Sequence, residues 1–265
     1  MAWLTGCAIG MARPSSMPDL GDVLSGSARV RFDASRLDCE SDPLAWFDPS
    51  SPQLQAQSVT VGGRQAAWFV NIQGYPAVLR HYRRGGLVAT LSSDRYLWTG
   101  WDSSRPFAEF SLMRELGDLG LPVPAPLAAA VWRDGLTYRA AILVDRVPDA
   151  RTLATCEEIH AWEAAGQAIA TMHAKGVWHA DLNVHNILID AQSQAWLIDF
   201  DRGRRFKALS EHKRQGNLDR LHRSIRKVLP GKEPILWPVL CNAYFQARQV
   251  NGASTACAKK IYHQR

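Results

Sequence analysis

The sequence predicts an α+β protein of two lobes, with an antiparallel sheet in the small lobe and mainly helices in the large lobe. Strand-like runs separated by turn residues dominate residues 58–147, and amphipathic helical patterns are prominent beyond them. Runs of strands followed by runs of helices are typical of α+β folds. We therefore divide the chain into a flexible leader (residues 1–28), a small lobe (29–147) and a large lobe (148–265).

The overall composition is that of a basic globular protein. With 265 residues, 46% of them hydrophobic and 21% charged, the chain can bury one large core or two lobes. The formal net charge of +6 favours anionic partners, but it does not distinguish nucleotides, phosphorylated glycolipids, membrane surfaces and nucleic acids. Five scattered cysteines without a C-x-x-C pair favour free thiols in a reducing compartment. No apolar run approaches the ~18 residues that a membrane-spanning helix needs.

The small lobe begins with strands joined by tight turns. Two strand patterns, residues 58–61 and 66–70, flank a turn that contains Gly62 and Gly63, and a third strand covers residues 77–82. Glycines at such a turn let backbone N–H groups approach a phosphate closely. A plain hairpin turn explains the two glycines equally well.

A helix and two further strands complete the small lobe. The helix is expected to start after Ser104, and Glu109 lies in its first turn. Strands over residues 128–132 and 137–144 then lead to a hinge at residues 145–147. The apolar face of the helix is formed by residues at three-residue steps: Phe107, Phe110, Met113 and Leu116.

Two amphipathic helices are expected in the large lobe. The first starts at a capping box formed by Thr155 and Glu158 and ends at Gly176. The second covers residues 217–229 and has a basic face. That face fits either a solvated surface or a surface turned toward anionic headgroups.

The segment between these helices carries the chemistry. Asp181 and Asn186 are five residues apart in D-x-x-x-x-N, and Asp199 follows at the end of an apolar run. Two short apolar runs around a polar turn predict a β-hairpin that returns Asn186 and Asp199 to one edge. In kinase-type sites one Asp accepts the proton of the attacking hydroxyl, while an Asn and a second Asp bind Mg²⁺ on the nucleotide. We predict these roles for Asp181, Asn186 and Asp199, with ATP as donor, in a bilobal protein-kinase-like fold. His179 is expected to pack beneath the loop.

Four segments resemble the lipopolysaccharide kinase family of the protein-kinase superfamily. They read H-A-D-L-N-V-H-N-I-L, L-I-D-F-D-R-G-R, V-L-R-H-Y-R-R-G-G and R-P-F-A-E-F, and the resemblance covers roughly residues 59–226. It implies that Arg80 occupies the place of the usual nucleotide-binding lysine. An arginine can still bind phosphates through its planar fork of donors, although a solvated strand arginine is the alternative. The resemblance also makes Glu109 the partner of this residue, with Glu115 as a second candidate, and places Gly62 and Gly63 over the phosphates.

The resemblance implies a particular reaction and place. It implies an ATP-dependent, Mg²⁺-dependent kinase that phosphorylates the 4-hydroxyl of a 3-deoxy-D-manno-octulosonic acid (Kdo) residue on a lipid A precursor, in lipopolysaccharide core biosynthesis. Such an enzyme works as a peripheral protein at the cytoplasmic face of the bacterial inner membrane. Arg202 and Arg204 are candidates to meet the sugar carboxylate.

Other functions remain open at this point. The chain can be another small-molecule or atypical protein kinase of the same fold, or a non-catalytic kinase-fold scaffold, although the intact Asp181, Asn186 and Asp199 argue against a scaffold. Ala180 replaces the arginine of the regulatory H-R-D form, and no A-P-E segment follows, which argues against a regulated protein-substrate kinase. No motif indicates nucleic-acid binding, and no obligate protein partner is inferred.

Overall fold

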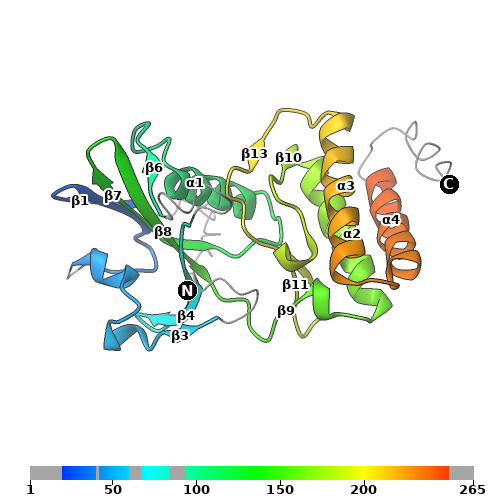
Figure 1. The fold of residues 1–265 in the computed structure, drawn as a ribbon, viewed down its shortest axis with the longest axis horizontal. Helices are drawn as coiled ribbons and strands as arrows, with labels where there is room; N and C mark the ends of the chain where they lie inside the picture. Colours follow the sequence, from blue (N-terminus) through cyan, green and yellow to red (C-terminus); the bar gives the residue numbers. More distant parts are fainter. Residues whose placement is uncertain (1–19, 40–41, 60–66, 84–93, 251–265) are drawn as a thin grey trace, which may run out of the picture.

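The computed structural model describes residues 20–39, 42–59, 67–83 and 94–250. Figure 1 shows two lobes, one built around a twisted sheet and one formed mainly by helices. The predicted α+β class and bilobal arrangement are confirmed. Gly62 and Gly63 lie outside the described residues, so their contact with phosphate stays a prediction.

The small lobe is built on an eight-stranded antiparallel sheet. Its strands follow the order β1-β2-β7-β8-β5-β4-β3, with β6 paired to β8. The bounds are β1 Leu20–Ser25, β2 Ala28–Asp33, β3 Gln57–Ser58, β4 Ala67–Ile72, β5 Tyr75–His81, β6 Tyr96–Leu97, β7 Pro126–Asp134 and β8 Thr137–Asp145.

The first two strands were not predicted, and β1 falls inside the leader assigned to residues 1–28. Residues Leu20–Ser25 pair with Ala28–Asp33 in register, so this part of the leader is a strand. β1 is an edge strand with little buried surface, so its sequence lacks a strong apolar alternation. Charge pairs fix it instead, because Asp22 accepts hydrogen bonds from Arg29 and Arg31.

Both faces of the sheet are covered. Successive residues of a strand point to opposite faces, and Ala129 and Ile142 accordingly share a buried cluster with helix α1 (Arg105–Asp118). Ala128 and Leu143 belong to the opposite cluster, beneath two short 3₁₀ helices, Pro43–Phe47 and Pro52–Leu54. The four apolar residues predicted for the helix face are all buried: Phe107, Phe110, Met113 and Leu116.

Helix α1 carries Glu109 into the interior. The helix begins after Ser104, as predicted, and Glu109 is its fifth residue, just past the first turn in which it was expected. Its side chain is only 1% exposed. A carboxylate this deeply buried requires partners, which the cleft supplies.

The described part of the large lobe contains three long helices and small sheets. The helices are α2 Ile159–Ala174, α3 Glu211–Val228 and α4 Glu233–Val250. The strands are β9 Arg151–Thr152, β10 Val177–Trp178, β11 Ile187–Ile189, β12 Ala195–Leu197 and β13 Arg204–Arg205. Helices α2 and α4 approach closely at Gly166, where a Cβ would collide with the carbonyl oxygen of Leu240. Among the described residues, no helix has the length and hydropathy needed to cross a bilayer.

Two predicted features of the large lobe need correction, and one helix was not predicted. The capping box is wrong, because Thr155 ends a 3₁₀ helix and donates to Thr152 O, and α2 starts only at Ile159. The basic helix predicted from residue 217 begins at Glu211, after Ser210, whose side chain caps it. Helix α4 was not predicted. The hairpin of β11 and β12 and the helix end at Gly176, with φ of 79°, are confirmed.

Candidate active site

The β11–β12 hairpin brings Asn186 and Asp199 to one edge. The strands pair with Ile187 opposite Leu197, so Asn186 lies just before one strand and Asp199 just after the other. The backbone N–H of Ile198 donates to Asn186 O at 3.1 Å, which extends the pairing by one step. The turn is held by Asp190, whose carboxylate accepts from Gln192 N and Gln194 N. Short-range pairing therefore determines this half of the site.

The loop that carries Asp181 is fixed to the hairpin at two points. The side-chain amide of Asn186 donates to Asp181 O at 2.9 Å, which leaves its Oδ1 available to a cation. His179 is fully buried beneath the loop; its Nδ1 accepts from Asp181 N at 3.1 Å and its Nε2 lies 2.9 Å from Ile198 O. Burial lowers the pKa of His179, which favours the neutral ring that these bonds require. His179 thus positions the loop, as expected.

A second buried layer, which the sequence reasoning missed, lies under His179. Asn217 of α3 is 2% exposed; its amide nitrogen donates to His179 O at 2.6 Å and its Oδ1 accepts from His179 N at 3.2 Å. His173 of α2 bonds to Asn217 Oδ1 at 3.2 Å and to the hydroxyl of Tyr244 at 2.9 Å. Three helices therefore support the loop that carries Asp181. A local signal was available in the sequence. Asn217 lies four and eight residues before Leu221 and Ile225, so a polar residue stands on the apolar face of the helix.

The burial of His173 predicts that the free energy of unfolding depends on pH. Burial lowers the pKa of His173 from 6.5 to about 4. Between these two pH values the histidine is protonated in the unfolded state and neutral in the folded state. The contribution of His173 to the free energy of unfolding is therefore fully present above pH 6.5. It decreases as the pH falls, by about 2 kcal/mol near pH 5.

Urea unfolding across this window should measure the loss, with His173→Gln as the comparison. Glutamine does not titrate, so the variant should show a shallower pH dependence than the wild type. His179 contributes in the same direction in both proteins and cancels in the difference. Equal slopes in the two proteins would contradict the role assigned to His173.

Arg80 joins the two lobes across the cleft. Its Nη2 lies 2.6 and 2.7 Å from the two carboxylate oxygens of Glu109, and its Nη1 forms an ion pair with Asp199 Oδ1. The hydroxyl of Tyr82 donates to the same Glu109 carboxylate. One guanidinium therefore contacts both Glu109 and Asp199. Its planar fork of donors makes this possible, whereas the compact ammonium of a lysine would bridge the two carboxylates less readily.

The charges of this cluster stabilise one another. Burial by itself lowers the pKa of Arg80, but the attraction of Glu109 and Asp199 outweighs it and raises that pKa well above the usual value. Burial raises the pKa of Glu109 despite Arg80, whereas for Asp199 the charge of Arg80 overcomes burial and lowers the pKa. Asp199 is thus held as a carboxylate, the form that binds cations. Glu115 forms an ion pair with Arg205 instead, so the second candidate partner of Arg80 is excluded.

Asp181 faces the open side of the loop. Its side chain is 57% exposed, and Oδ1 lies 2.6 Å from Arg220 Nη1 on α3. Arg220 was not assigned to the site from the sequence, because nothing local connects it to a loop 39 residues earlier.

The donor set fits a magnesium ion bound together with nucleotide phosphates. Mg²⁺ is held in such sites by one or two protein oxygens, with phosphates and water completing its shell. Asn186 Oδ1 and the second oxygen of Asp199 are such donors at one edge of the hairpin. Within the described ranges there is no group of three or more His, Cys, Asp or Glu residues able to bind a metal by themselves.

These features define a class of protein. An antiparallel small lobe, a strand cation paired with a helix glutamate, and an Asp, Asn and Asp set on a loop and hairpin are the components of protein-kinase-like phosphotransferases. The model of the lipopolysaccharide kinase (Kdo/WaaP) family matches residues 51–244, and the chain belongs to this family. It is accordingly a phosphotransferase that uses an alcohol group as acceptor.

The curated relatives carry a more specific name. A protein of Xanthomonas axonopodis pv. citri (strain 306) called 3-deoxy-D-manno-octulosonic acid kinase is 48% identical over 207 residues, which is 77% of this chain and 82% of the relative. A protein of the same name from Xylella fastidiosa (strain M23) is 50% identical over 204 residues, 75% of this chain and 80% of its own. The family resemblance seen in the sequence is confirmed.

Proposed function

We propose that this protein transfers the γ-phosphate of ATP to the 4-hydroxyl of a Kdo residue on a lipid A precursor, in lipopolysaccharide core biosynthesis. The observation that carries the proposal is the cross-lobe cluster in which Arg80 links Glu109 to Asp199, beside the loop that presents Asp181. The names of the relatives support the choice of acceptor.

Each residue of the site has a distinct task in this reaction. Asp181 orients the acceptor hydroxyl and takes its proton as the oxygen attacks phosphorus, and Arg220 beside it compensates charge. Asn186 and Asp199 hold Mg²⁺, which supplies charge neutralisation of the phosphates when bound. Arg80 would bind the nucleotide phosphates, and its ion pairs keep Glu109 and Asp199 in place.

The hinge offers a place for adenine. The N–H groups of Asp145 and Arg146 already donate to Ala125 O at 2.8 Å and Pro76 O at 3.1 Å. We therefore assign adenine recognition to Val147 and to the carbonyl groups of residues 145–147.

The test compares two acceptors. Purified protein is incubated with Mg-ATP and either a Kdo-bearing lipid A precursor or the same precursor without Kdo, and the product of the first reaction is analysed by ³¹P–¹H NMR to locate the phosphate. Transfer to the Kdo-bearing acceptor alone, at the 4-hydroxyl, and its loss with EDTA, is the expected result. Binding of ATP without transfer to either acceptor would instead favour a different substrate or a scaffold.

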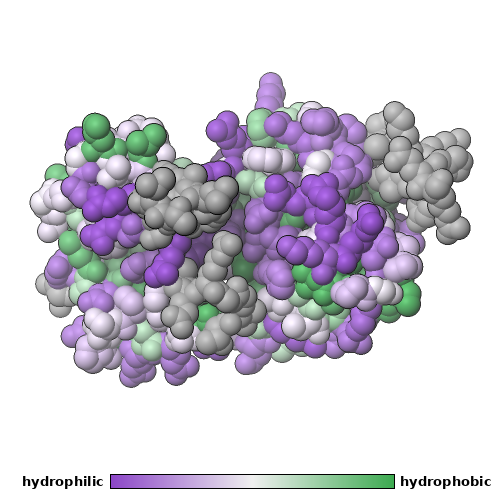
Figure 2. All heavy atoms as spheres, in the orientation of Figure 1, coloured by the Kyte–Doolittle hydropathy of each residue, from purple (hydrophilic) through white to green (hydrophobic). Residues whose placement is uncertain are grey.

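We also propose that the protein lies peripherally on the cytoplasmic face of the inner membrane, with α3 toward the lipid. The buried side of α3 is formed by Asn217, Leu218, Leu221 and Ile225. Its exposed side carries Arg220, Arg223, Arg226 and Lys227, and Figure 2 shows strongly hydrophilic side chains over this helix. Because Arg220 also contacts Asp181, the basic surface and the catalytic loop open toward the same side.

Binding to vesicles measures this contact. Each basic residue near an anionic surface contributes about 1 kcal/mol, so Arg223→Gln with Arg226→Gln should weaken binding to phosphatidylglycerol-containing vesicles roughly 30-fold. Co-sedimentation at low ionic strength gives the measurement, with pure phosphatidylcholine vesicles as the neutral reference. The small-lobe pair Arg133→Gln and Arg139→Gln, which removes the same charge, is the matched control. Equal weakening by both pairs would leave only a net-charge effect and reject the orientation.

A further inference from the structure

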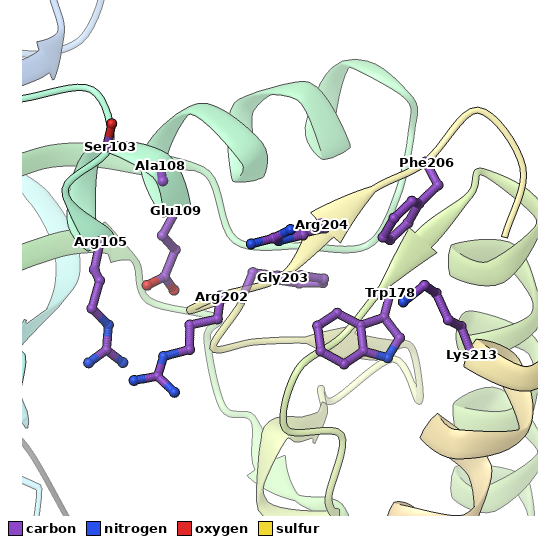
Figure 3. Close-up of a pocket in the computed structure, with 11 residues that line it drawn as sticks. Ser103, Arg105, Ala108, Glu109, Trp178, Arg202, Gly203, Arg204, Phe206 and Lys213 are labelled. Atoms are coloured by element: carbon purple, nitrogen blue, oxygen red, sulfur yellow. The ribbon is translucent and has the colours of Figure 1, made fainter. Parts of the chain in front are cut away.

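A cavity with a strongly positive lining lies beside the active site. Its volume is about 680 Å³, and it is an open cavity lined by α1, β10, the segment after Asp199 and the start of α3. Figure 3 shows the wall of α1 facing the wall formed by Trp178 and Lys213, with Arg202–Arg204 between them. Four lining residues are cationic: Arg105, Arg202, Arg204 and Lys213.

Most of this charge has no internal counterpart. Glu109 is the one carboxylate among the described lining residues, and it is already engaged by Arg80 and Tyr82. Arg105 is neutralised by Asp201, which lies 2.8 Å from its Nε. Arg202, Arg204 and Lys213 have no carboxylate within ion-pair distance in the part of the chain that the structure describes. Like charges gathered in one cavity repel each other, so an anion that enters relieves this repulsion.

The apolar part of the lining strengthens the field. Lys213 Nζ lies 5.3 Å from the ring centre of Trp178 and 4.9 Å from that of Phe206, within the range of cation–π contacts. These contacts hold the ammonium at the wall. Apolar, low-dielectric walls beside clustered charges focus the potential into the space between them, and Phe200 adds to that wall.

The position of the cavity connects it with phosphoryl transfer. Trp178 stands three residues before Asp181, and Arg202 stands three residues after Asp199. A chain spans at most ~3.6 Å per residue, so the Cα atoms in each pair are within ~11 Å of each other. An acceptor larger than a single sugar can thus place its hydroxyl at Asp181 and an anionic group in the cavity.

We propose that this cavity binds an anionic group of the acceptor, a carboxylate or a phosphate, through Arg202, Arg204 and Lys213. The inference rests on the proposed function for the identity of the acceptor. Arginine forks recognise both anions through paired hydrogen bonds, and the aromatic wall offers the sugar an apolar surface. The site would set the acceptor affinity rather than the affinity for ATP.

The kinetic test uses Arg202→Gln with Arg204→Gln. Each charge-assisted hydrogen bond lost costs about tenfold in affinity or more, so KM for the Kdo-bearing lipid A precursor should rise by about 100-fold while KM for ATP stays unchanged. The pair Arg133→Gln and Arg139→Gln removes the same charge elsewhere and should leave both KM values unchanged. Circular dichroism and urea unfolding establish that the double variant is folded. An unchanged acceptor KM, or a rise in KM for ATP instead, overturns the proposal.

Modified acceptors identify which anion is bound. One acceptor carries the Kdo carboxyl as its amide, and another lacks the lipid A phosphates. One of these two acceptors lacks the anionic group that the cavity binds. The wild type should show a raised KM for that acceptor, and the double variant should raise this KM no further. If both modified acceptors retain the full effect of the double variant, neither anion occupies the cavity.

A binding measurement separates failure of this inference from failure of the proposed function. Inorganic phosphate is titrated calorimetrically at low ionic strength into the wild type, the double variant and Lys213→Met. Weaker binding to the variants, combined with no transfer by the wild type to the Kdo-bearing acceptor, supports the anion site and rejects that acceptor. Equal phosphate binding and an unchanged acceptor KM, with transfer intact, reject the anion site and leave the function standing.

Discussion

Replacing Asp181 with asparagine is expected to lower kcat by about 10²–10⁴-fold while the fold persists. Asparagine keeps the shape of the side chain but cannot accept the proton of the attacking hydroxyl. The ion pair with Arg220 that is lost lies at an exposed position, where such pairs contribute only about 0.2–1 kcal/mol to stability. Single-turnover transfer to the acceptor, followed with saturating Mg-ATP, measures the chemical step separately from binding.

Asp219→Asn serves as the matched control for this variant. Asp219 is an exposed aspartate on α3 next to Arg220, and its hydrogen bond to Gln215 stays on the helix surface. The control removes the same charge by the same change and should retain wild-type turnover. Full activity of Asp181→Asn would show that another group accepts the proton, and the assigned mechanism would have to be abandoned.

The second large effect is expected on stability, from Arg80→Gln. Removing one member of a buried ion pair costs about 3–5 kcal/mol, because the remaining charge loses its compensation. Glu109, 1% exposed, would retain Tyr82 as its partner, and Asp199 would lose the charge that keeps its pKa low. Urea unfolding at neutral pH gives the free energy, and the variant should also bind ATP more weakly.

The loss of stability in Arg80→Gln is also expected to depend on pH. The positive charge of Arg80 is the main effect that opposes burial at Glu109. Without Arg80, burial raises the pKa of Glu109 further. A folded-state pKa above the unfolded value gives stability that is present at low pH and is lost as the pH rises. Arg80→Gln should therefore lose less stability in mildly acidic buffer than at neutral pH.

A double-mutant cycle tests the pairing directly. Arg80→Gln with Glu109→Gln leaves two neutral amides facing each other, so the double variant should be more stable than the sum of the single losses predicts. Arg105→Gln paired with Glu109→Gln provides the matched cycle, since Arg105 lies near the same wall but pairs with Asp201. Additive losses in the Arg80 cycle would mean that the two side chains are not coupled.

Features set by neighbouring residues were predictable from the sequence. The β11–β12 hairpin, the burial of His179 beneath the loop and the start of α1 follow from short-range patterns, and each was found where expected. The capping box failed because Thr155 had an equally local alternative, a 3₁₀ turn that bonds to Thr152 O. Helix α4 was not predicted because Pro238 lies inside it and interrupts the helical sequence pattern. Its packing against α2 is a tertiary contact that the sequence pattern does not show.

The sequence by itself indicated a kinase, which membership of the family confirms. The spacing of Asp181, Asn186 and Asp199 requires only a loop and a hairpin, whose formation is governed by residues within a few positions. Only the tertiary structure decided which residues surround that set, since Arg220 and Asn217 reach the loop across 39 and 38 positions through the docking of α3. The anion cavity depends on docking in the same way, because α1, β10 and α3 supply its walls. Such contacts are fixed by how helices pack on the core. A local pattern can mark a residue such as Asn217 as buried, but it does not specify which distant residue it meets.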